Sequence, residues 1–224
     1  MCRKYSIPDD FTPVIAGDRS PRAPPRGSVV VYADELEAGM RLPLHPFYVT
    51  VLSHYGIAPG QLMPNGWRAL AGFVVLSHFT GVPPSLAVFR HFFSLCGFPH
   101  KHYSFSGNDA VGILFRQPNL KNPGWKEEYF FLSSTAPWPC PVQWGAHYRA
   151  SNFQQVLTRT EEVVAANLLR ARGASPVDLR MYLHESNMAK ASIIRPPSPP
   201  PAPQAQGGVS IVELSYNVAI NLKV

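Results

Sequence analysis

The chain has 224 residues, of which 46% are hydrophobic and 15% charged, so it is long and apolar enough to bury the core of one ordinary domain. Three scattered cysteines are too few for a disulfide framework, and no basic start followed by an apolar run suggests a signal peptide, so we expect an intracellular protein of the nucleus or cytoplasm. The longest apolar stretch, residues 67–79, contains Arg68 and is too short for a membrane span of roughly 20 residues, so it predicts a buried helix.

The positive charge is concentrated in the middle of the sequence. The formal net charge is +6, and residues 39–126 carry seven basic side chains against one acid, Asp109, whereas the charges elsewhere balance. Such a domain can attract RNA or DNA, and the alternative is a modestly basic domain without a polyanionic partner. The seven candidate nucleic-acid-binding residues are Arg41, Arg68, Arg90, Lys101, Arg116, Lys121 and Lys126.

The first part of the chain predicts an arm followed by two short elements. Residues 1–27 combine prolines with five basic residues and little apolar periodicity, so we expect a flexible basic arm without packed structure. Val29 opens a β-branched and aromatic run that predicts a strand or an extended lead-in. The acids from Asp34 onward favour a short helix that ends near Gly39.

Three short helices are predicted next. Pro46 suits the first turn of a helix that stops at Gly56, and Pro64 begins a second helix that contains residues 67–79. Ser85 begins the third helix after two prolines. The apolar side of this third helix carries Leu86, Phe89, Phe92, Phe93 and Cys96.

From Gly97 onward the pattern becomes that of strands. Residues 103–105 and 111–115 alternate apolar with small or polar side chains on either side of Gly107-Asn-Asp, which predicts a hairpin. Residues 129–132 supply a third strand. We therefore expect a small antiparallel sheet beside the helices.

Two more helices are predicted in the last third of the chain. Thr160 opens one with acids in its first turn, and Gly173 closes it after two arginines. Ser175, followed by a proline, predicts the cap of a last helix that frays after Glu185.

The predicted fold class is α+β. A compact helical half of about three short helices packs beside the small antiparallel sheet, with two further C-terminal helices and disordered ends. The predicted segments are the arm at 1–27, a central domain at 28–150, a helical extension at 151–190, a proline-rich linker at 191–208 and an unmatched tail at 209–224.

The most distinctive motifs of the sequence lie within residues 42–95. They are Leu-Pro-Leu-His-Pro-Phe at 42–47, Asn65-Gly-Trp-Arg-Ala-Leu-Ala-Gly-Phe and Pro84-Ser-Leu-Ala-Val-Phe-Arg-His-Phe-Phe; further motifs are Val29-Val-Val-Tyr-Ala-Asp, Gly124-Trp-Lys-Glu-Glu-Tyr-Phe-Phe-Leu, Trp138 and Trp144. Over roughly residues 28–150 the chain resembles the domain called putative gypsy-type transposase, found in plant retroelement proteins. The resemblance implies an origin in a gypsy-type retrotransposon, and it implies no particular reaction.

The sequence lacks the catalytic signatures of retroelement enzymes. The protease tripeptides Asp-Thr-Gly and Asp-Ser-Gly do not occur, and the adjacent pair Asp9 and Asp10 falls in the predicted arm. For the three carboxylates of a transposase the candidates are Asp34, Asp109 and Glu128, which equally suit a helix start, a turn and a solvated strand. Phosphate-loop, dinucleotide and serine-elbow motifs are also missing. We expect no enzyme, no cofactor and no small-molecule substrate.

One group of side chains has the composition of a metal site. His91, Cys96, His100 and His102 are zinc-ligand types at short spacing, but the spacing matches no common zinc module and no gag-type zinc knuckle is present. His91 and Cys96 fall in the third predicted helix, where ordinary surface or core roles are the simpler expectation. No metal is therefore expected.

Aromatic and basic residues are interleaved on or near the predicted sheet. Bases can stack on such rings while cations meet phosphates, and the alternative is that Phe105, Phe115 and Phe131 are core residues. The interleaved residues are Tyr103, Phe105, Arg116, Trp125, Lys126 and Tyr129. We expect a non-enzymatic, gag-like protein that self-associates or binds nucleic acid. The alternatives are a catalytic transposase or nuclease, and a degenerate fragment with no selected activity.

Overall fold

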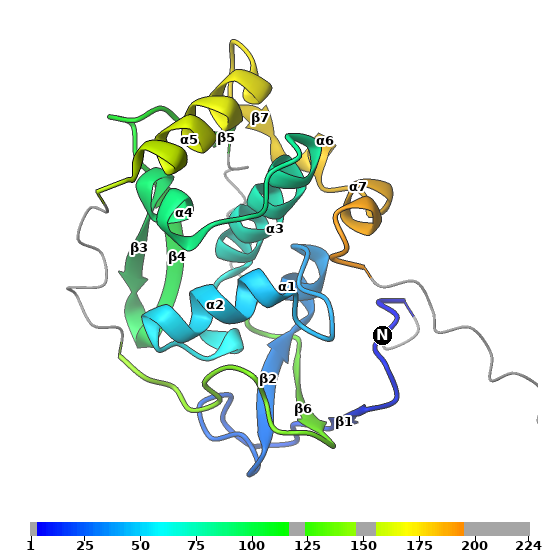
Figure 1. The fold of residues 1–224 in the computed structure, drawn as a ribbon. Helices are drawn as coiled ribbons and strands as arrows, with labels where there is room; N and C mark the ends of the chain where they lie inside the picture. Colours follow the sequence, from blue (N-terminus) through cyan, green and yellow to red (C-terminus); the bar gives the residue numbers. More distant parts are fainter. Residues whose placement is uncertain (1–3, 117–123, 147–155, 195–224) are drawn as a thin grey trace, which may run out of the picture.

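A computed structural model of the chain describes residues 4–116, 124–146 and 156–194 (Figure 1). It has the predicted α+β architecture, with short helices around one long central helix and three small sheets. The elements in chain order are β1 (Phe11–Val14), β2 (Ser28–Tyr32), α1 (Ala33–Glu37), α2 (Pro46–Tyr55), η1 (Pro59–Gln61), α3 (Pro64–Phe79), α4 (Leu86–Phe92), β3 (Phe93–Phe98), η2 (Pro99–Lys101), β4 (His102–Gly107), β5 (Phe115–Arg116), β6 (Tyr129–Ser134), α5 (Arg159–Arg172), β7 (Val177–Asp178), α6 (Leu179–Tyr182) and α7 (Glu185–Lys190).

Helix α3 forms the centre of the molecule, and α1, α5, α6, α7 and β4 pack against it (Figure 1). The predicted boundaries of the first two helices of the trio are confirmed, because Pro46 and Pro64 occupy their first turns and Gly56 ends α2 with a left-handed φ of 65°. Rings from three helices meet in the core. Phe73 lies 5.3 Å from Phe47 and 5.2 Å from Phe89 between ring centroids. None of the described helices is long and apolar enough to cross a membrane.

Strand β2 has its two faces covered by different clusters. Val29 and Val31 belong to the main core, whereas Val30 and Tyr32 belong to a second cluster with Trp125 and other residues. Because successive side chains of a strand point to opposite faces, a strand covered on both sides needs an uninterrupted apolar run. The predicted strand and the short helix α1 that follows it are both confirmed.

The prediction that residues 1–27 lack packed structure is wrong for the described part of that segment. Strand β1 pairs antiparallel with β6 in a sheet of order β1-β6-β2, and Tyr5 is only 7% exposed. The prolines of this segment favoured a loop in the prediction. Proline is excluded from central strands, but it is tolerated on an edge strand such as β1, which contains Pro13.

The third predicted helix ends earlier than expected. Helix α4 stops at Phe92, and residues 93–98 form β3, in which Phe93 and Leu95 are buried and Ser94 is exposed. A short apolar run satisfies the spacing of a helix and of a strand almost equally, which is why Cys96 was placed on a helix. It is half-buried on β3.

The predicted hairpin around Gly107 is also wrong. Strand β4 pairs antiparallel with β3 through the turn η2, where His100 and Lys101 have φ values of 68° and 59°. Strand β5 pairs in parallel with β7 instead. This turn could not be predicted from the sequence, because positive φ is uncommon for residues other than glycine.

The later helix is confirmed, and the last one is corrected. Thr158 caps α5, accepting from the Glu161 amide while the Glu161 carboxylate accepts from the Thr158 amide at 2.8 Å. Asp178, rather than Ser175, caps the next helix by accepting from the Arg180 amide at 2.9 Å. Helix α7 begins at Glu185, where fraying was expected. Residues 195–224, which include most of the predicted linker and the whole tail, lie outside the described residues.

Replacement of Gly60 by alanine is expected to lower the free energy of unfolding by about 1–3 kcal/mol, because overpacking a filled core has a cost of that order. A Cβ at Gly60 would lie 2.3 Å from Cγ1 of Val30 and 2.7 Å from its carbonyl oxygen. Urea denaturation measures the change. The matched control is Gly97→Ala, whose Cβ would make ordinary contacts of 3.7 Å with Tyr103. Equal losses in the two variants would contradict the close packing of η1 on β2.

Candidate nucleic-acid interface

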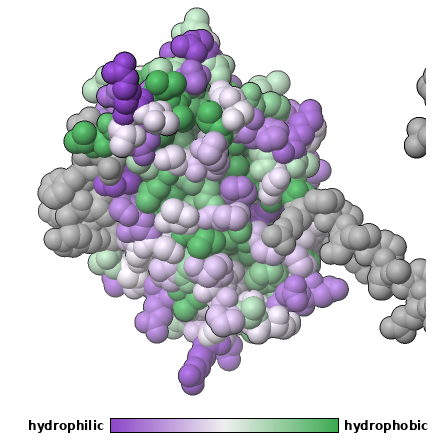
Figure 2. Space-filling view, viewed as in Figure 1, coloured by the Kyte–Doolittle hydropathy of each residue, from purple (hydrophilic) through white to green (hydrophobic). Residues whose placement is uncertain are grey.

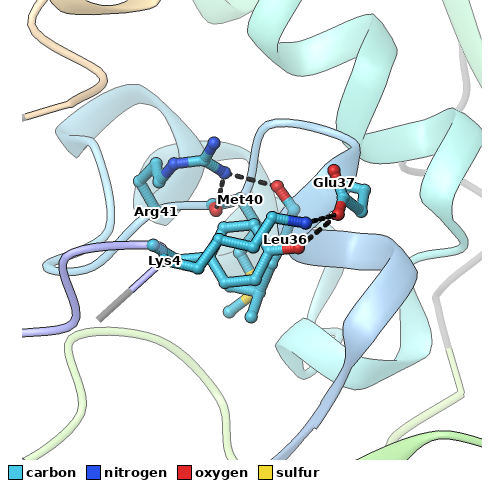
Figure 3. A network of polar contacts seen from close by, with 6 residues as sticks. Lys4, Leu36, Glu37, Met40 and Arg41 are labelled. Atoms are coloured by element: carbon cyan, nitrogen blue, oxygen red, sulfur yellow. Dashed lines mark hydrogen bonds and ion pairs between the residues drawn. The ribbon is translucent and has the colours of Figure 1, made fainter. Parts of the chain in front are cut away.

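Arg41 is held in a structural role. It is 7% exposed, and its Nη1 donates to the carbonyl oxygens of Leu36 and Met40, near the end of α1 (Figure 3). Its guanidinium carbon lies 5.2 Å from the ring centroid of Tyr5. Burial lowers the pKa of Arg41, and the carboxylate of Glu185 opposes that shift. The guanidinium therefore closes the end of α1 and is largely withdrawn from the surface.

The two candidate arginines that lie on helices, Arg68 on α3 and Arg90 on α4, are half-buried. Nη1 of Arg68 donates to Oδ1 of Asn65 at 3.0 Å, and burial lowers the pKa of Arg68. Arg90 interacts with Tyr55: burial raises the pKa of Tyr55, whereas the charge of Arg90 and a side-chain hydrogen bond from it oppose that shift. Both guanidinium groups thus have partners within the fold.

The candidate cations that face solvent lie on strand β5, in the turn η2 or in a connection between elements. Lys101 in η2, Arg116 on β5 and Lys126 are exposed, and Lys121 lies outside the described residues. On the face seen in Figure 2, hydrophobic residues are scattered among hydrophilic ones, as is usual for a protein surface. Of the predicted residues, Lys126 lies against the ring of Trp125, and Lys101 directly precedes His102 in the chain.

An aromatic cluster surrounds His102, the first residue of β4. We call it the His102 cluster, and it comprises His102, Tyr32, Trp125, Tyr129 and Trp144. The ring of His102 lies 5.2 Å from Trp125 and 5.1 Å from Trp144 between centroids, both in edge-to-face geometry. Tyr32 packs on Trp125 at 4.8 Å and on Tyr129 at 5.7 Å. Trp144 and Tyr129 are half-buried, so two rings reach the surface.

Positive side chains surround the His102 cluster. Nζ of Lys126 lies 5.3 Å from the ring centroid of Trp125. The pKa of His102 falls to about 4, mainly because the ring is buried, and the charges of Lys126, Arg22 and His100 lower it further. The imidazole is therefore neutral at physiological pH, and the charges of Lys126 and Arg22 are near enough to act on it.

The two nitrogens of His102 differ. Nδ1 lies 3.2 Å from the carbonyl oxygen of Pro99, and because a carbonyl can only accept, Nδ1 is the nitrogen that carries the proton. Nε2 therefore presents a lone pair. It is buried and has no hydrogen-bond partner among the described residues.

Gln61, which is fully buried, fixes the segments that bear the cluster. Its Oε1 accepts from the amides of Ala58 at 3.0 Å and Gly145 at 3.1 Å. Its Nε2 donates to the carbonyls of Lys101 at 3.0 Å and Gly145 at 2.8 Å. One side chain thus ties η1, the turn η2 and the residue next to Trp144 together.

Some residues of the candidate interface were not predicted from the sequence. Arg22 was assigned to a flexible arm, but the hydroxyl of Tyr129 donates to the Arg19 carbonyl at 2.7 Å and holds that segment against β6. His102 was considered as a metal ligand and not as the centre of an aromatic cluster. The spacing of Trp125 and Tyr129 was a usable signal, whereas the approach of Trp144 depends on a tertiary contact.

A groove adjoins the His102 cluster along the β3–β4 hairpin. Its volume is about 480 Å³, and Met63, which packs on the second apolar cluster with Trp125, is among its lining residues. Phe98, which is 46% exposed, lies opposite His102 in the strand register. Hydroxyls of Ser104 and Ser106 and the amide of Asn65 supply polar groups to the lining. The groove thus extends the aromatic surface with hydrogen-bonding groups.

The other predicted stacking residues are core. Tyr103 and Phe105 are 5% and 2% exposed, Phe115 is 3% exposed, and Phe131 is fully buried. Phe105 packs edge-on against Phe89 at 4.8 Å. These four rings are therefore core residues and are not available for stacking with bases. Of the predicted aromatic residues, Trp125 and Tyr129 remain at the candidate interface.

The predicted metal and carboxylate candidates lie on several different elements. His91 lies on α4, Cys96 on β3, His100 in η2 and His102 on β4. Asp34 is on α1, whereas Asp109 and Glu128 lie in connections. Within residues 4–116, 124–146 and 156–194, no group of three or more His, Cys, Asp or Glu residues is placed to hold a metal ion.

One carboxyl group, that of Glu35, is buried in the core and is not part of the candidate interface. Glu35 is fully buried, and its Oε2 accepts from the amide of Tyr32 at 3.1 Å. Burial raises the pKa of Glu35 well above its ordinary value, and the Tyr32 amide and the Trp67 indole oppose this shift. Since no solvent reaches it, Glu35 is a structural acid of the core.

The structure thus defines an α+β domain with an aromatic and basic surface cluster. Residues 29–97 match the model of the family described as "Putative gypsy type transposon". The resemblance is confirmed for this segment, which runs from β2 into β3 and is shorter than the predicted span of 28–150. No curated protein and no solved structure matches the chain.

Proposed function

We propose that this chain is a non-enzymatic, gag-like protein of a plant gypsy-type element that associates with single-stranded RNA or DNA in the nucleus or cytoplasm. The observation that carries the proposal is the His102 cluster, where partly exposed rings lie beside Lys126 and the charge of Arg22 is near enough to act on His102. Single-stranded nucleic acids are bound by this combination, because bases stack on aromatic rings while cations contact the phosphates.

The location of the cluster supports a single-stranded ligand. The rings sit at one end of the β3–β4 hairpin, and the groove that continues along the hairpin carries the exposed ring of Phe98 and hydroxyl groups. A flexible strand can follow such a surface, whereas the stacked bases of a duplex cannot reach the rings.

Replacement of Lys101 or Lys126 by glutamine is expected to weaken binding of a 20-nucleotide single strand and to lower the slope of log affinity against log salt by about 0.7 per lysine. Both residues are exposed; Lys126 lies against the ring of Trp125, and Lys101 directly precedes His102 in the chain. Fluorescence anisotropy over a salt series measures both quantities.

The matched control is Lys190→Gln, an exposed residue on α7. Its slope should equal that of the wild type. Absence of wild-type binding even at low salt would overturn the proposal, and cleavage of the strand on addition of Mg²⁺ would favour a catalytic transposase or nuclease. Light scattering on the same sample tests self-association, for which a gag-like role requires species larger than a monomer.

A further inference from the structure

We infer that the His102 cluster is a binding site for one nucleobase that bears an exocyclic amino group, and that this amino group donates a hydrogen bond to Nε2 of His102. The inference rests on the proposed function and adds a specificity to it. Adenine, cytosine and guanine bear such an amino group.

The acceptor is defined by the geometry of the β3–β4 turn. The Pro99 carbonyl fixes the proton on Nδ1, so Nε2 can only accept, and the ring is 4% exposed. A buried acceptor without a partner is unfavourable, and a ligand that supplies an N–H removes that penalty. The side chain therefore favours a donor on the ligand.

The surroundings favour a flat ring as the bearer of that donor. Tyr32, Trp125 and Trp144 surround His102 with centroid distances of 6.4, 5.2 and 5.1 Å. Tyr32 and Trp125 are buried and form fixed walls, whereas Trp144 is half-buried. A base that displaces Trp144 gains stacking on the remaining rings and reaches Nε2.

The cations provide the place for the attached phosphate. Lys126 and Arg22 are close enough to lower the pKa of His102 through their charge, and Lys101 directly precedes His102 in the chain. Thymine and uracil fit less well, because they have no exocyclic amino group to donate to Nε2.

The test uses the full chain and two oligonucleotides of thymidines that differ at one central position. One carries adenine there, and the other carries N6,N6-dimethyladenine, which keeps the ring but lacks the N–H. Wild-type protein is expected to bind the adenine strand about fivefold more tightly, the ratio typical of one net hydrogen bond. His102→Phe, which keeps an aromatic ring but no acceptor, is expected to bind both strands equally.

The outcomes separate the inference from the proposed function. Tight binding of both strands by the wild type without preference overturns the base site and leaves nucleic-acid association standing. No binding of either strand at low salt overturns both. If His102→Phe does not fold, as judged by circular dichroism, the ratio of the two affinities for the wild-type protein decides alone.

Discussion

Replacement of Gln61 by alanine is expected to lower the free energy of unfolding by about 3–5 kcal/mol and to release Trp144 from the His102 cluster. The side chain makes four hydrogen bonds to three backbone segments, each worth about 1 kcal/mol, and its removal also leaves buried groups without partners. Urea denaturation measures the loss of stability, and acrylamide quenching of tryptophan fluorescence measures the release.

Two further variants sharpen this expectation. Gln61→Glu can still accept from the Ala58 and Gly145 amides but cannot donate to the Lys101 and Gly145 carbonyls, so its loss should be of similar size unless the carboxyl group is protonated. Gln143→Ala alters an exposed glutamine in the same stretch as Gly145 and should leave stability within about 0.5 kcal/mol. A Gln61→Ala protein as stable as the Gln143→Ala protein would show that the three segments hold together without this side chain.

Replacement of Glu35 by glutamine is expected to flatten the dependence of stability on pH. The folded pKa of Glu35 is raised, so above the unfolded value of about 4.5 the folded chain retains a proton that the unfolded chain has lost. The free energy of unfolding therefore falls as pH rises, by up to about 1.4 kcal/mol per pH unit, until the folded pKa is reached. Below the unfolded pKa both states are protonated and the contribution disappears.

The measurement is a set of urea denaturations at half-unit intervals from pH 4 to pH 8. Relative to wild type, Glu35→Gln should gain stability steadily as pH increases. Glu127→Gln serves as the control because Glu127 is exposed, and it should keep the wild-type slope. Parallel wild-type and Glu35→Gln curves would show that Glu35 is ionised in the folded protein.

Much of the helical half was predictable because its boundaries are set by local chemistry. Pro46, Gly56 and Pro64 occupy the positions that begin or end helices, and their backbone requirements do not depend on distant residues. The capping of α5 by Thr158 and Glu161 is local in the same way. Such signals act within a few residues, so a single sequence contains them.

Pairing between strands and the composition of the interface were not predictable in this way. Strand β1 is recognisable only from its partner β6, and the β3–β4 turn relies on positive φ at His100 and Lys101. Lys126 and Trp125 are neighbours in the sequence, but Trp144 and Arg22 reach His102 through contacts made by Gln61 and Tyr129. Charge counting also selected Arg41, because it cannot distinguish a buried structural guanidinium from a surface one.

The order β1-β6-β2 affects how the chain can be divided for experiments. Strand β6, from residues 129–134, lies between two strands that precede it in the sequence by about a hundred residues. A fragment cut at the limits of the family match, 29–97, would contain β2 but not its partner β6 or the third strand β1, and it would lack β4 and α5. The family match thus covers less of the chain than the three-stranded sheet does, and fragments intended to fold should contain β1, β2 and β6 together.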